Sequence, residues 1–326
     1  MRALPVKISL LLHLLLLQLG FLAPKLSNAQ ALKVTLLGTG APIPNIERFG
    51  PSILVEAGAA KLLFDCGRGA SQRLWQLKIP LGMVNTVFFT HLHSDHTVGF
   101  PDLWLTGGLP GLYGRRAAPM QVLGPAGTQA MMTALKQAYA WDLRVRAVQD
   151  MEEAGNKVVA KDIRQGVVYE KDGVKVTAFD VNHGEHLKPA LGYRIDYAGH
   201  SVVLSGDTNY SDNLIAFAKG ADVVVHEVAA AKEELLRKSA MAREVMSYHT
   251  QPEQAGKVFA LIKPRLAVYS HIVLLTTDPT IPPPTVQELL PRTSTAYAGH
   301  VEVGEDLMTI EIGSEVTVRR FVSPGK

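Results

Sequence analysis

The sequence of 326 residues contains a single cysteine, Cys66. One thiol excludes a disulfide within the chain, and a chain of this length can bury enough core to fold without one. A lipoprotein is also excluded, because Cys66 lies far from the N-terminus. Charged residues make up only 19% of the sequence and hydrophobic residues 47%, which is typical of a globular protein. The sequence has no internal repeat and no low-complexity linker.

Long hydrophobic runs are missing except near the N-terminus. The one run, Ile8 to Phe21, follows the basic residues Arg2 and Lys7 and precedes Ser27-Asn28-Ala29. This pattern predicts a signal peptide over residues 1–29, with Ala29-Gln30-Ala31 as an alternative cleavage site. A membrane anchor is the less favoured interpretation, because the run is short for spanning a bilayer. We therefore expect a periplasmic or secreted protein with no stable membrane association after cleavage.

The sequence also lacks a strong excess of charge of either sign. The formal net charge is +3, and the predicted signal peptide carries three basic residues and no acidic one. The mature chain is therefore close to neutral. Neutrality argues against nucleic acid as a partner, although a local basic patch would be compatible with it.

Strands and helices alternate along the rest of the sequence. Apolar runs predict strands at 32–37, 52–56, 61–64, 87–89, 120–123, 174–181, 191–197, 201–205, 223–225, 266–270, 295–302 and 307–312, and amphipathic stretches predict helices at 70–77, 99–106, 128–139, 213–218 and 252–262. Residues 142–170 are polar and ambiguous, with a strand signal only at Val167 to Tyr169. This alternation predicts a layered α/β fold in one domain, residues 30–326.

One stretch, His91-Leu92-His93-Ser94-Asp95-His96, places three histidines and an aspartate directly after an apolar strand. Imidazole and carboxylate groups together suit zinc and similar metals. The alternative is a polar loop in which Asp95 caps a helix, but a cap needs one such residue and four are present. The stretch therefore predicts a metal site.

Other histidines and one aspartate follow strands later in the chain. His183, His226 and His271 lie at or just after predicted strands, and Gly206-Asp207-Thr208 follows another. Because ligand sites in α/β sheets gather at the carboxyl ends of the strands, these residues predict one convergent site. A cap of the turn is the alternative role for Asp207, and a buried structural role is favoured for His226.

The motif His91-x-His93-x-Asp95-His96, followed in order by His183, Gly206-Asp207-Thr208 and Ser270-His271, resembles the metallo-β-lactamase superfamily. The resemblance covers nearly all of residues 32–312. It implies an αββα four-layer sandwich, in which two mixed β-sheets are flanked by helices, and a pair of zinc ions. His91, His93 and His183 would bind the first ion, Asp95, His96 and His271 would bind the second, and Asp207 would bridge the two.

Two zinc ions so placed would hold a hydroxide between them as the nucleophile. Ligand imidazoles need hydrogen-bond acceptors behind them, for which Asp65 and Glu227 are the candidates. His186 competes with His183 for one ligand position, and the Asn182-His183-Gly184 pattern favours His183.

Further stretches resemble the branch that contains tRNase Z and the zinc arylsulfatases. These are Gly38-Thr39-Gly40, Phe64 to Gly69, Gly192-Tyr193-Arg194, His226-Glu227 and His249-Thr250. The resemblance implies that His249 assists proton transfer to the leaving group, so Asp95 and His249 are the expected catalytic residues; a surface position before a helix is the alternative for His249. Two features depart from tRNase Z: residues 142–170 do not resemble its basic tRNA-gripping arm, and an exported enzyme would not meet tRNA.

These observations favour an exported dinuclear zinc hydrolase that cleaves a small anionic ester, either a phosphodiester or an aryl sulfate. The expected partner is that small molecule; nucleic acid is not expected for an exported protein, and a homodimer stays open. The alternatives are tRNase Z if the protein is not exported, a β-lactamase, a glyoxalase-type thioesterase, and a metal-dependent binding protein without turnover. Specificity is expected to reside in residues 107–119 and 142–170, where Tyr113, Arg115 and Arg116 are favoured as solvent-exposed and only alternatively as substrate contacts.

Overall fold

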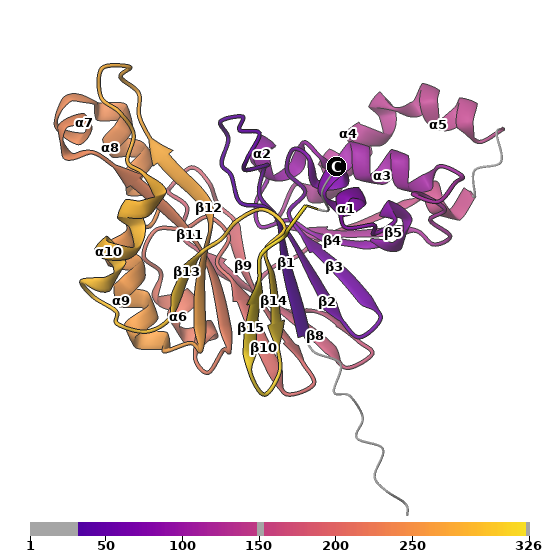
Figure 1. The fold of residues 1–326 in the computed structure, drawn as a ribbon. Coiled ribbons are helices and arrows are strands. Elements are labelled where there is room, and N and C mark those ends of the chain that lie inside the picture. Colours follow the sequence, from indigo (N-terminus) through magenta and orange to yellow (C-terminus); the bar gives the residue numbers. More distant parts are fainter. Residues whose placement is uncertain (1–31, 149–152, 324–326) are drawn as a thin grey trace, which may run out of the picture.

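The computed structural model describes residues 32–148 and 153–323. The predicted signal peptide, residues 1–29, lies outside the described residues and stays a prediction. Two β-sheets pack face to face, and helices cover the outer face of each (Figure 1). The predicted αββα sandwich with two mixed sheets is thereby confirmed. No helix among the described residues is both long enough and apolar enough to cross a membrane.

The first sheet has the strand order β15-β14-β1-β2-β3-β4-β5-β6. Its strands are β1 (Leu32–Gly38), β2 (Ser52–Ala57), β3 (Ala60–Phe64), β4 (Thr86–Phe88), β5 (Met120–Gly124), β6 (Val158–Asp162), β14 (Thr309–Ile312) and β15 (Val316–Arg319). The helices on its side are α1 (Ala70–Gln76), α2 (Ser94–Thr97), α3 (Phe100–Gly108), α4 (Thr128–Ala138) and α5 (Ala140–Arg146), with 3-10 turns at Leu81–Met83 and Glu153–Asn156.

The second sheet has the strand order β13-β12-β11-β10-β9-β8-β7. Its strands are β7 (Gly166–Lys171), β8 (Val174–Val181), β9 (Ala190–Tyr197), β10 (His200–Leu204), β11 (Val223–Ala231), β12 (Leu266–Leu275) and β13 (Val301–Val303). The helices on its side are α6 (Asp212–Ala218), α7 (Glu233–Lys238), α8 (Ala240–Ser247), α9 (Pro252–Ile262) and α10 (Leu289–Ser294), with a 3-10 turn at Val286–Glu288.

Most strands are buried on both faces, which explains why they are apolar at almost every position. In β1, Leu36 packs in the core between the two sheets, while the adjacent Leu37 packs under α1 and α3. In the second sheet, Val202 and Val203 divide in the same way between the central core and the layer under α6 and α9. The period-2 geometry of a strand thus builds three stacked apolar layers.

Strand direction decides where the site forms. Strands β3 to β6 run parallel in the first sheet, and β10 to β13 run parallel in the second. The carboxyl ends of these strands reach the same edge of the sandwich, where α2 lies between the two sheets in Figure 1. The segments that leave the strands there carry the predicted ligands, as expected for an α/β fold.

Several elements differ from those expected. The strand predicted at 295–302 is wrong over most of its length, because α10 ends at Ser294, a turn and irregular chain follow, and pairing with β12 begins only at Val301. Strands β11 and β12 continue well beyond the predicted ends. Helices α7 and α8 pack against these extended strand ends in an apolar cluster of their own beside the site. The ambiguous stretch 142–170 holds the end of α5, a 3-10 turn, β6 and most of β7.

Candidate active site

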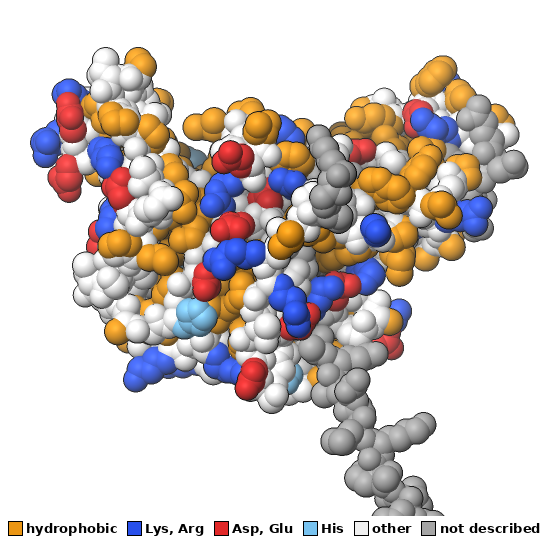
Figure 2. All heavy atoms as spheres, viewed as in Figure 1, with side chains coloured by type: hydrophobic (Ala, Val, Ile, Leu, Met, Phe, Trp, Pro, Cys, Tyr) orange, Lys and Arg blue, Asp and Glu red, His pale blue; other side chains and the backbone are white. Residues whose placement is uncertain are grey.

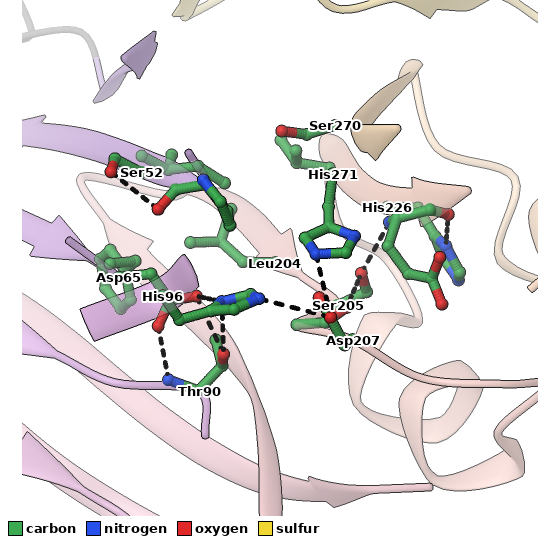
Figure 3. Close-up of a pocket in the computed structure, with 16 residues that line it drawn as sticks. Ser52, Asp65, Thr90, His96, Leu204, Ser205, Asp207, His226, Ser270 and His271 are labelled. Carbon is green, nitrogen blue, oxygen red and sulfur yellow. Dashed lines mark hydrogen bonds and ion pairs between the residues drawn. The ribbon is translucent and has the colours of Figure 1, made fainter. Parts of the chain in front are cut away.

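The loop after β4 carries the histidine motif and is held from below by Asp65. The backbone N–H and the hydroxyl of Thr90 each donate to the Asp65 carboxylate, at 2.8 and 2.9 Å. Nδ1 of His96 lies 2.8 Å from Oδ2 of the same carboxylate. Figure 3 shows His96 lying between Asp65 and Thr90 on one side and Asp207 on the other. The prediction that Asp65 supports a ligand imidazole is confirmed.

The same loop packs tightly on the turn after β3. A side chain on Gly67 would lie 2.5 Å from the carbonyl oxygen of Asp95. The backbone N–H of Cys66 donates to the carbonyl of His96, and the N–H of Gly99 donates to the carbonyl of Cys66. The glycine-rich turn therefore serves to bring backbone close to backbone.

Three of the predicted ligands form one cluster. One ring nitrogen from each of His91, His93 and His183 lies within 4.8 Å of the other two. His183 is buried and is held by its Nδ1, 3.1 Å from the carbonyl oxygen of Tyr248, whereas His186 is exposed and belongs to none of the metal-capable groups of the described residues. The structure thus brings together the residues assigned to the first ion, with His183 rather than His186.

Asp95, His96 and His271 form a second such cluster. His271 lies in a β-bulge, because Glu227 of β11 pairs with Ser270 and Val228 pairs with Ile272, leaving His271 unpaired. Its φ angle of +43° is in the left-handed region, which a non-glycine residue rarely adopts. A bulge re-aims a side chain relative to its strand, and here it directs the imidazole to within 3.4 Å of Oδ2 of Asp95.

Asp207 lies at the centre of both clusters. Its Oδ2 is 3.1 Å from Nε2 of His271, 3.3 Å from Nε2 of His96, 3.7 Å from Nε2 of His183 and 3.9 Å from Nε2 of His91. Gly206 makes this position possible. Its φ is +61°, and a Cβ there would lie 2.5 Å from the carbonyl oxygen of Leu191, so only glycine fits the turn that follows β10.

The electrostatics of the cluster suit a cation. Burial lowers the pKa of His91 well below its usual value and also lowers the pKa of His183, so both imidazoles stay neutral and able to ligate. Burial opposes the charged form of His96, but Asp207 and Asp65 together raise its pKa well above the usual value. Burial likewise opposes the carboxylate form of Asp207, yet His271 and His96 hold its pKa well below the normal range. A divalent ion bound here would place positive charge opposite the Asp207 carboxylate.

The buried polar atoms that lack a partner test whether the site fits a metal. Within the part of the chain that the structure describes, Nε2 of His96, Nε2 of His183 and Nδ1 of His271 are buried without a hydrogen-bond partner. A buried polar atom is normally satisfied. The Nε2 atoms of His96 and His183 both face Asp207, and a metal ion between them and Asp207 would bind their lone pairs. The residues present therefore fit a divalent metal site.

His249 lies beside this cluster and is supported by Glu227. Nδ1 of His249 is 3.2 Å from Oε1 of Glu227, which also accepts from the backbone N–H groups of Thr208 and Thr250. Burial opposes the charged form of His249, but Glu227 raises its pKa to about 8. A ring nitrogen of His249 lies within 4.8 Å of a carboxylate oxygen of Asp207 and of a ring nitrogen of His183. The imidazole is thus buried at the site and not on the surface, and Glu227 supports His249 and not one of the seven predicted ligands.

Two other residues have structural roles. His226 is fully buried, its Nδ1 lies 2.6 Å from the carbonyl oxygen of Glu227, and its ring packs edge-on against Phe259. Arg116 was predicted to be solvent-exposed, and this prediction is wrong. It is completely buried and donates to the carbonyl oxygens of Leu81, Leu103 and Trp104 and to Asn85, so it closes the end of α3.

The cluster lies at the base of a cleft of about 480 Å³. His93, Asp95, His183, Asp207 and His271 line the base of the cleft, and His249 lies beside them. The walls are mostly apolar and come from the loop that contains Ile43, from β12 and from α8 with Tyr248. Under the metal-facing side chains, between the sheets, a cavity of about 30 Å³ has room for a single water molecule.

Comparison with known proteins places the chain in a family. Residues 60–272 match the profile of the β-lactamase superfamily domain. The chain belongs to the metallo-β-lactamase superfamily. It is 33% identical over 289 residues to ribonuclease Z of Mycobacterium sp. (strain KMS), covering 88% of this chain and 99% of that protein. Ribonuclease Z of Mycobacterium bovis (strain BCG / Pasteur 1173P2) is 32% identical over 284 residues, covering 86% and 98%. These relatives place the chain in the tRNase Z branch of the superfamily.

Solved structures agree on the metallo-β-lactamase fold. The metallo-β-lactamase fold protein YhfI from Bacillus subtilis aligns with a TM-score of 0.65 and 17% identity, covering 86% of this chain and 99% of that one. The short form of human tRNase Z aligns with a TM-score of 0.62 and 21% identity, covering 86% and 99%. The predictions of the superfamily and of its tRNase Z branch are confirmed.

The prediction of a hydrolase of small anionic esters is wrong, whereas export stays a prediction. Relatives that match over almost their whole length are ribonuclease Z proteins, so the runner-up, tRNase Z, is favoured over an arylsulfatase-like enzyme. Near-zero net charge and a predicted signal peptide argue against an RNA substrate, but they are weaker signals than the motifs of the tRNase Z branch. What stands is a metal-dependent hydrolase of the metallo-β-lactamase fold.

Proposed function

We propose that this protein is a metal-dependent endoribonuclease that removes the 3′ trailer from precursor tRNA. The relationship to ribonuclease Z proteins over 98–99% of their length carries this proposal. The geometry agrees with it, because the site combines a candidate metal cluster with a separate buried imidazole, His249, that is supported by a carboxylate. Hydrolysis of an RNA phosphodiester needs both a charged centre for the phosphoryl oxygens and a proton for the leaving ribose oxygen.

We assign the seven clustered side chains as ligands of two zinc ions, with Asp207 shared between them. The proposed first set is His91, His93 and His183, and the second is Asp95, His96 and His271. Ions bound there would supply positive charge that activates water and offsets the charge of the phosphodiester. The chain keeps this set in position through Asp65, which orients His96, and through the Tyr248 carbonyl, which orients His183.

His249 is positioned to donate a proton to the oxygen that leaves phosphorus. The Glu227 carboxylate accepts from Nδ1 and stabilises the imidazolium, so the second ring nitrogen is available to the substrate. When the P–O bond breaks, the bond's electron pair stays on the leaving oxygen, and the proton of His249 neutralises it. Two backbone N–H groups hold Glu227 in place, so the pair is rigid before substrate arrives.

A β-lactamase reading is less compatible with this site. Asp207 contacts imidazoles of both clusters at 3.1 to 3.9 Å, and β-lactamases of this fold usually lack a carboxylate at that position. The face of the molecule in Figure 2 intersperses basic with acidic side chains.

The experiment compares purified, metal-analysed protein on four substrates: precursor tRNA with a 3′ trailer, mature tRNA, a cephalosporin and an aryl sulfate. We expect cleavage of the precursor at the trailer junction, loss of cleavage on chelation, and recovery on adding zinc. Turnover of the cephalosporin or the aryl sulfate by protein that leaves the precursor intact would overturn the proposal.

The predicted signal peptide and the proposed substrate belong to different compartments. Export predicts a mature N-terminus near Gln30 or Leu32, whereas work on precursor tRNA requires protein that is kept in the cytoplasm. N-terminal sequencing of the native protein from separated cell fractions decides between the two. A cytoplasmic chain with its N-terminal segment intact supports the RNA substrate, and an exclusively exported, cleaved chain contradicts it.

A further inference from the structure

A second hollow lies next to the cleft and shares His249 with it. It is a groove of about 450 Å³, a size within the range of small-molecule sites. Its lining residues are Asn182, Asn209, Tyr210, Leu236, Arg243, Met246, Ser247, His249, Gln251 and Gln254. We call this hollow the amide groove. None of the seven predicted metal ligands lines it, and among its described lining residues Arg243 is the only Lys or Arg.

Helix α8 separates the two hollows. Val245 of α8 and the adjoining Tyr248 line the cleft, whereas Arg243, Met246 and Ser247 line the amide groove. The chain then reaches His249, the one side chain that lines both. A substrate that spans both hollows would therefore place its scissile bond beside His249.

The two hollows differ in chemistry. The cleft has mostly apolar walls, whereas four carboxamides, one exposed tyrosine and one guanidinium line the amide groove. Carboxamides both donate and accept hydrogen bonds, which suits the edges of nucleobases. Single-stranded RNA is recognised by such edge contacts together with stacking on aromatic rings. Tyr210, which is 37% exposed, is available for stacking.

Asn209 shows an unused bonding capacity in this groove. Its Nδ2 donates to the carbonyl oxygen of Ser247 at 3.1 Å, which fixes the orientation of the side chain. Its Oδ1 is buried and has no hydrogen-bond partner among the described residues. Such an atom is costly unless a donor completes it. Because the oxygen is covered in the free protein, an exocyclic amine or a ring N–H of a base would complete it once the side chain turns toward the groove.

We propose that the amide groove binds the nucleoside that carries the leaving oxygen, with its base stacked on Tyr210 and hydrogen-bonded to Asn209. This inference rests on the proposed function, because it assumes a polynucleotide whose leaving oxygen takes its proton from His249. A small ester has no second nucleoside to fill the groove. The groove thus gives the site a preference for a chain that continues beyond the scissile phosphate.

The test combines protein variants with a modified substrate. Tyr210→Ala and Tyr210→Phe are assayed on a precursor tRNA and on the same RNA made abasic at the nucleoside that carries the leaving oxygen. We expect Tyr210→Ala to lower kcat/KM on the intact RNA about tenfold, and Tyr210→Phe to stay near wild type. On the abasic RNA the wild type should itself be slower, and Tyr210→Ala should cause no further loss. Metal content should not change.

Two further variants test whether the loss of kcat/KM is specific to the amide groove. Trp141→Ala removes an aromatic side chain that is 67% exposed on α5 and does not line the groove, so its kcat/KM should match wild type on both RNAs. Asn209→Ala should lower kcat/KM on the intact RNA and have no added effect on the abasic RNA. The inference is overturned if both groove variants cleave the intact RNA as wild type does, or if they lose as much on the abasic RNA as on the intact one.

Failure of the proposed function gives a different result. In that case the wild-type protein, with metal bound, leaves precursor tRNA uncut, and the groove variants are then irrelevant to RNA. If the wild type cuts the precursor and the groove variants behave like wild type on it, the function stands and the assignment of the amide groove falls.

Discussion

The two sheets contribute to the metal cluster in different ways. The first sheet provides His91, His93, Asp95 and His96 from one short loop after β4, and Asp65 holds this loop from below. The second sheet provides its residues one at a time: His183 and Asp207 follow the ends of β8 and β10, and His271 lies in a bulge within β12. The positions of four of the seven side chains therefore depend on local sequence, and the positions of the other three depend on strand register.

The second sheet needs unusual backbone to do this. Gly206 has φ of +61° before Asp207, and His271 has φ of +43° within a bulge of β12. Strained backbone of this kind persists only where the surrounding structure holds it. Interactions with the first sheet complete the arrangement, since Asp207 contacts His91 and His96 across the interface between the sheets. Each prediction below alters one side of this comparison.

Replacement of Asp207 should have the largest effect, because both halves of the cluster meet there. In Asp207→Ala we expect loss of at least one metal ion and a fall in kcat of about a thousandfold or more, as for other key electrostatic groups. Zinc stoichiometry and single-turnover cleavage of precursor tRNA measure it. Asp212→Ala, which removes an exposed acid of α6, is the control. A variant with normal zinc and normal rates would reduce Asp207 to a turn cap.

Replacement of His249 should slow the reaction without emptying the metal site. In His249→Ala we expect kcat on RNA to fall about a hundredfold or more, because the leaving oxygen loses its proton donor. The fall should be much smaller on a bis(p-nitrophenyl) phosphodiester, whose leaving group needs no proton. The exposed His186→Ala serves as the control. An equal loss on both substrates would rule out the role in leaving-group protonation.

Asp65→Asn weakens the support of the first sheet while leaving every proposed ligand present. His96 then loses the carboxylate at 2.8 Å from its Nδ1, and we expect metal affinity to fall about 10- to 100-fold. Competition with a chelator of known affinity gives the value. Asp102→Asn changes an exposed carboxylate of α3 that accepts from Thr106 and should bind metal normally. Unchanged affinity in Asp65→Asn would show that the loop holds its shape alone.

The smallest effect is expected for replacement of Gly206 in the turn that follows β10, and Gly220 serves as the comparison. Gly206→Ala forces a Cβ to 2.5 Å from the Leu191 carbonyl oxygen, whereas Gly220→Ala, at φ of +69°, meets nothing within 4 Å. We expect the free energy of unfolding to fall by about 2–4 kcal/mol in Gly206→Ala and by about 1 kcal/mol in Gly220→Ala. Denaturant titration measures both. Equal losses would show that the turn tolerates a side chain.

The part of the site that follows from local sequence was predictable. The six-residue histidine motif, the glycine before Asp207 and the apolar strands carry their signals within a few residues. Helices α7 and α8 were not predicted, because short polar helices give weak periodicity. Arg116 was misplaced for a different reason: a basic residue in a loop rich in glycine predicts exposure, and only the approach of the end of α3 and of Leu81 provides the carbonyl groups that bury it.

By itself the sequence determined which residue types were available for chemistry and at which strand ends they would emerge. It also determined the layered fold, because alternating apolar strands and amphipathic helices have few other ways to bury their surface. Only the tertiary structure decided that His183 rather than His186 joins the cluster, that Glu227 supports His249, and that Asn209 and Tyr210 line a groove behind it. These are contacts between residues far apart in the chain, and they depend on the register of two sheets that no local pattern records.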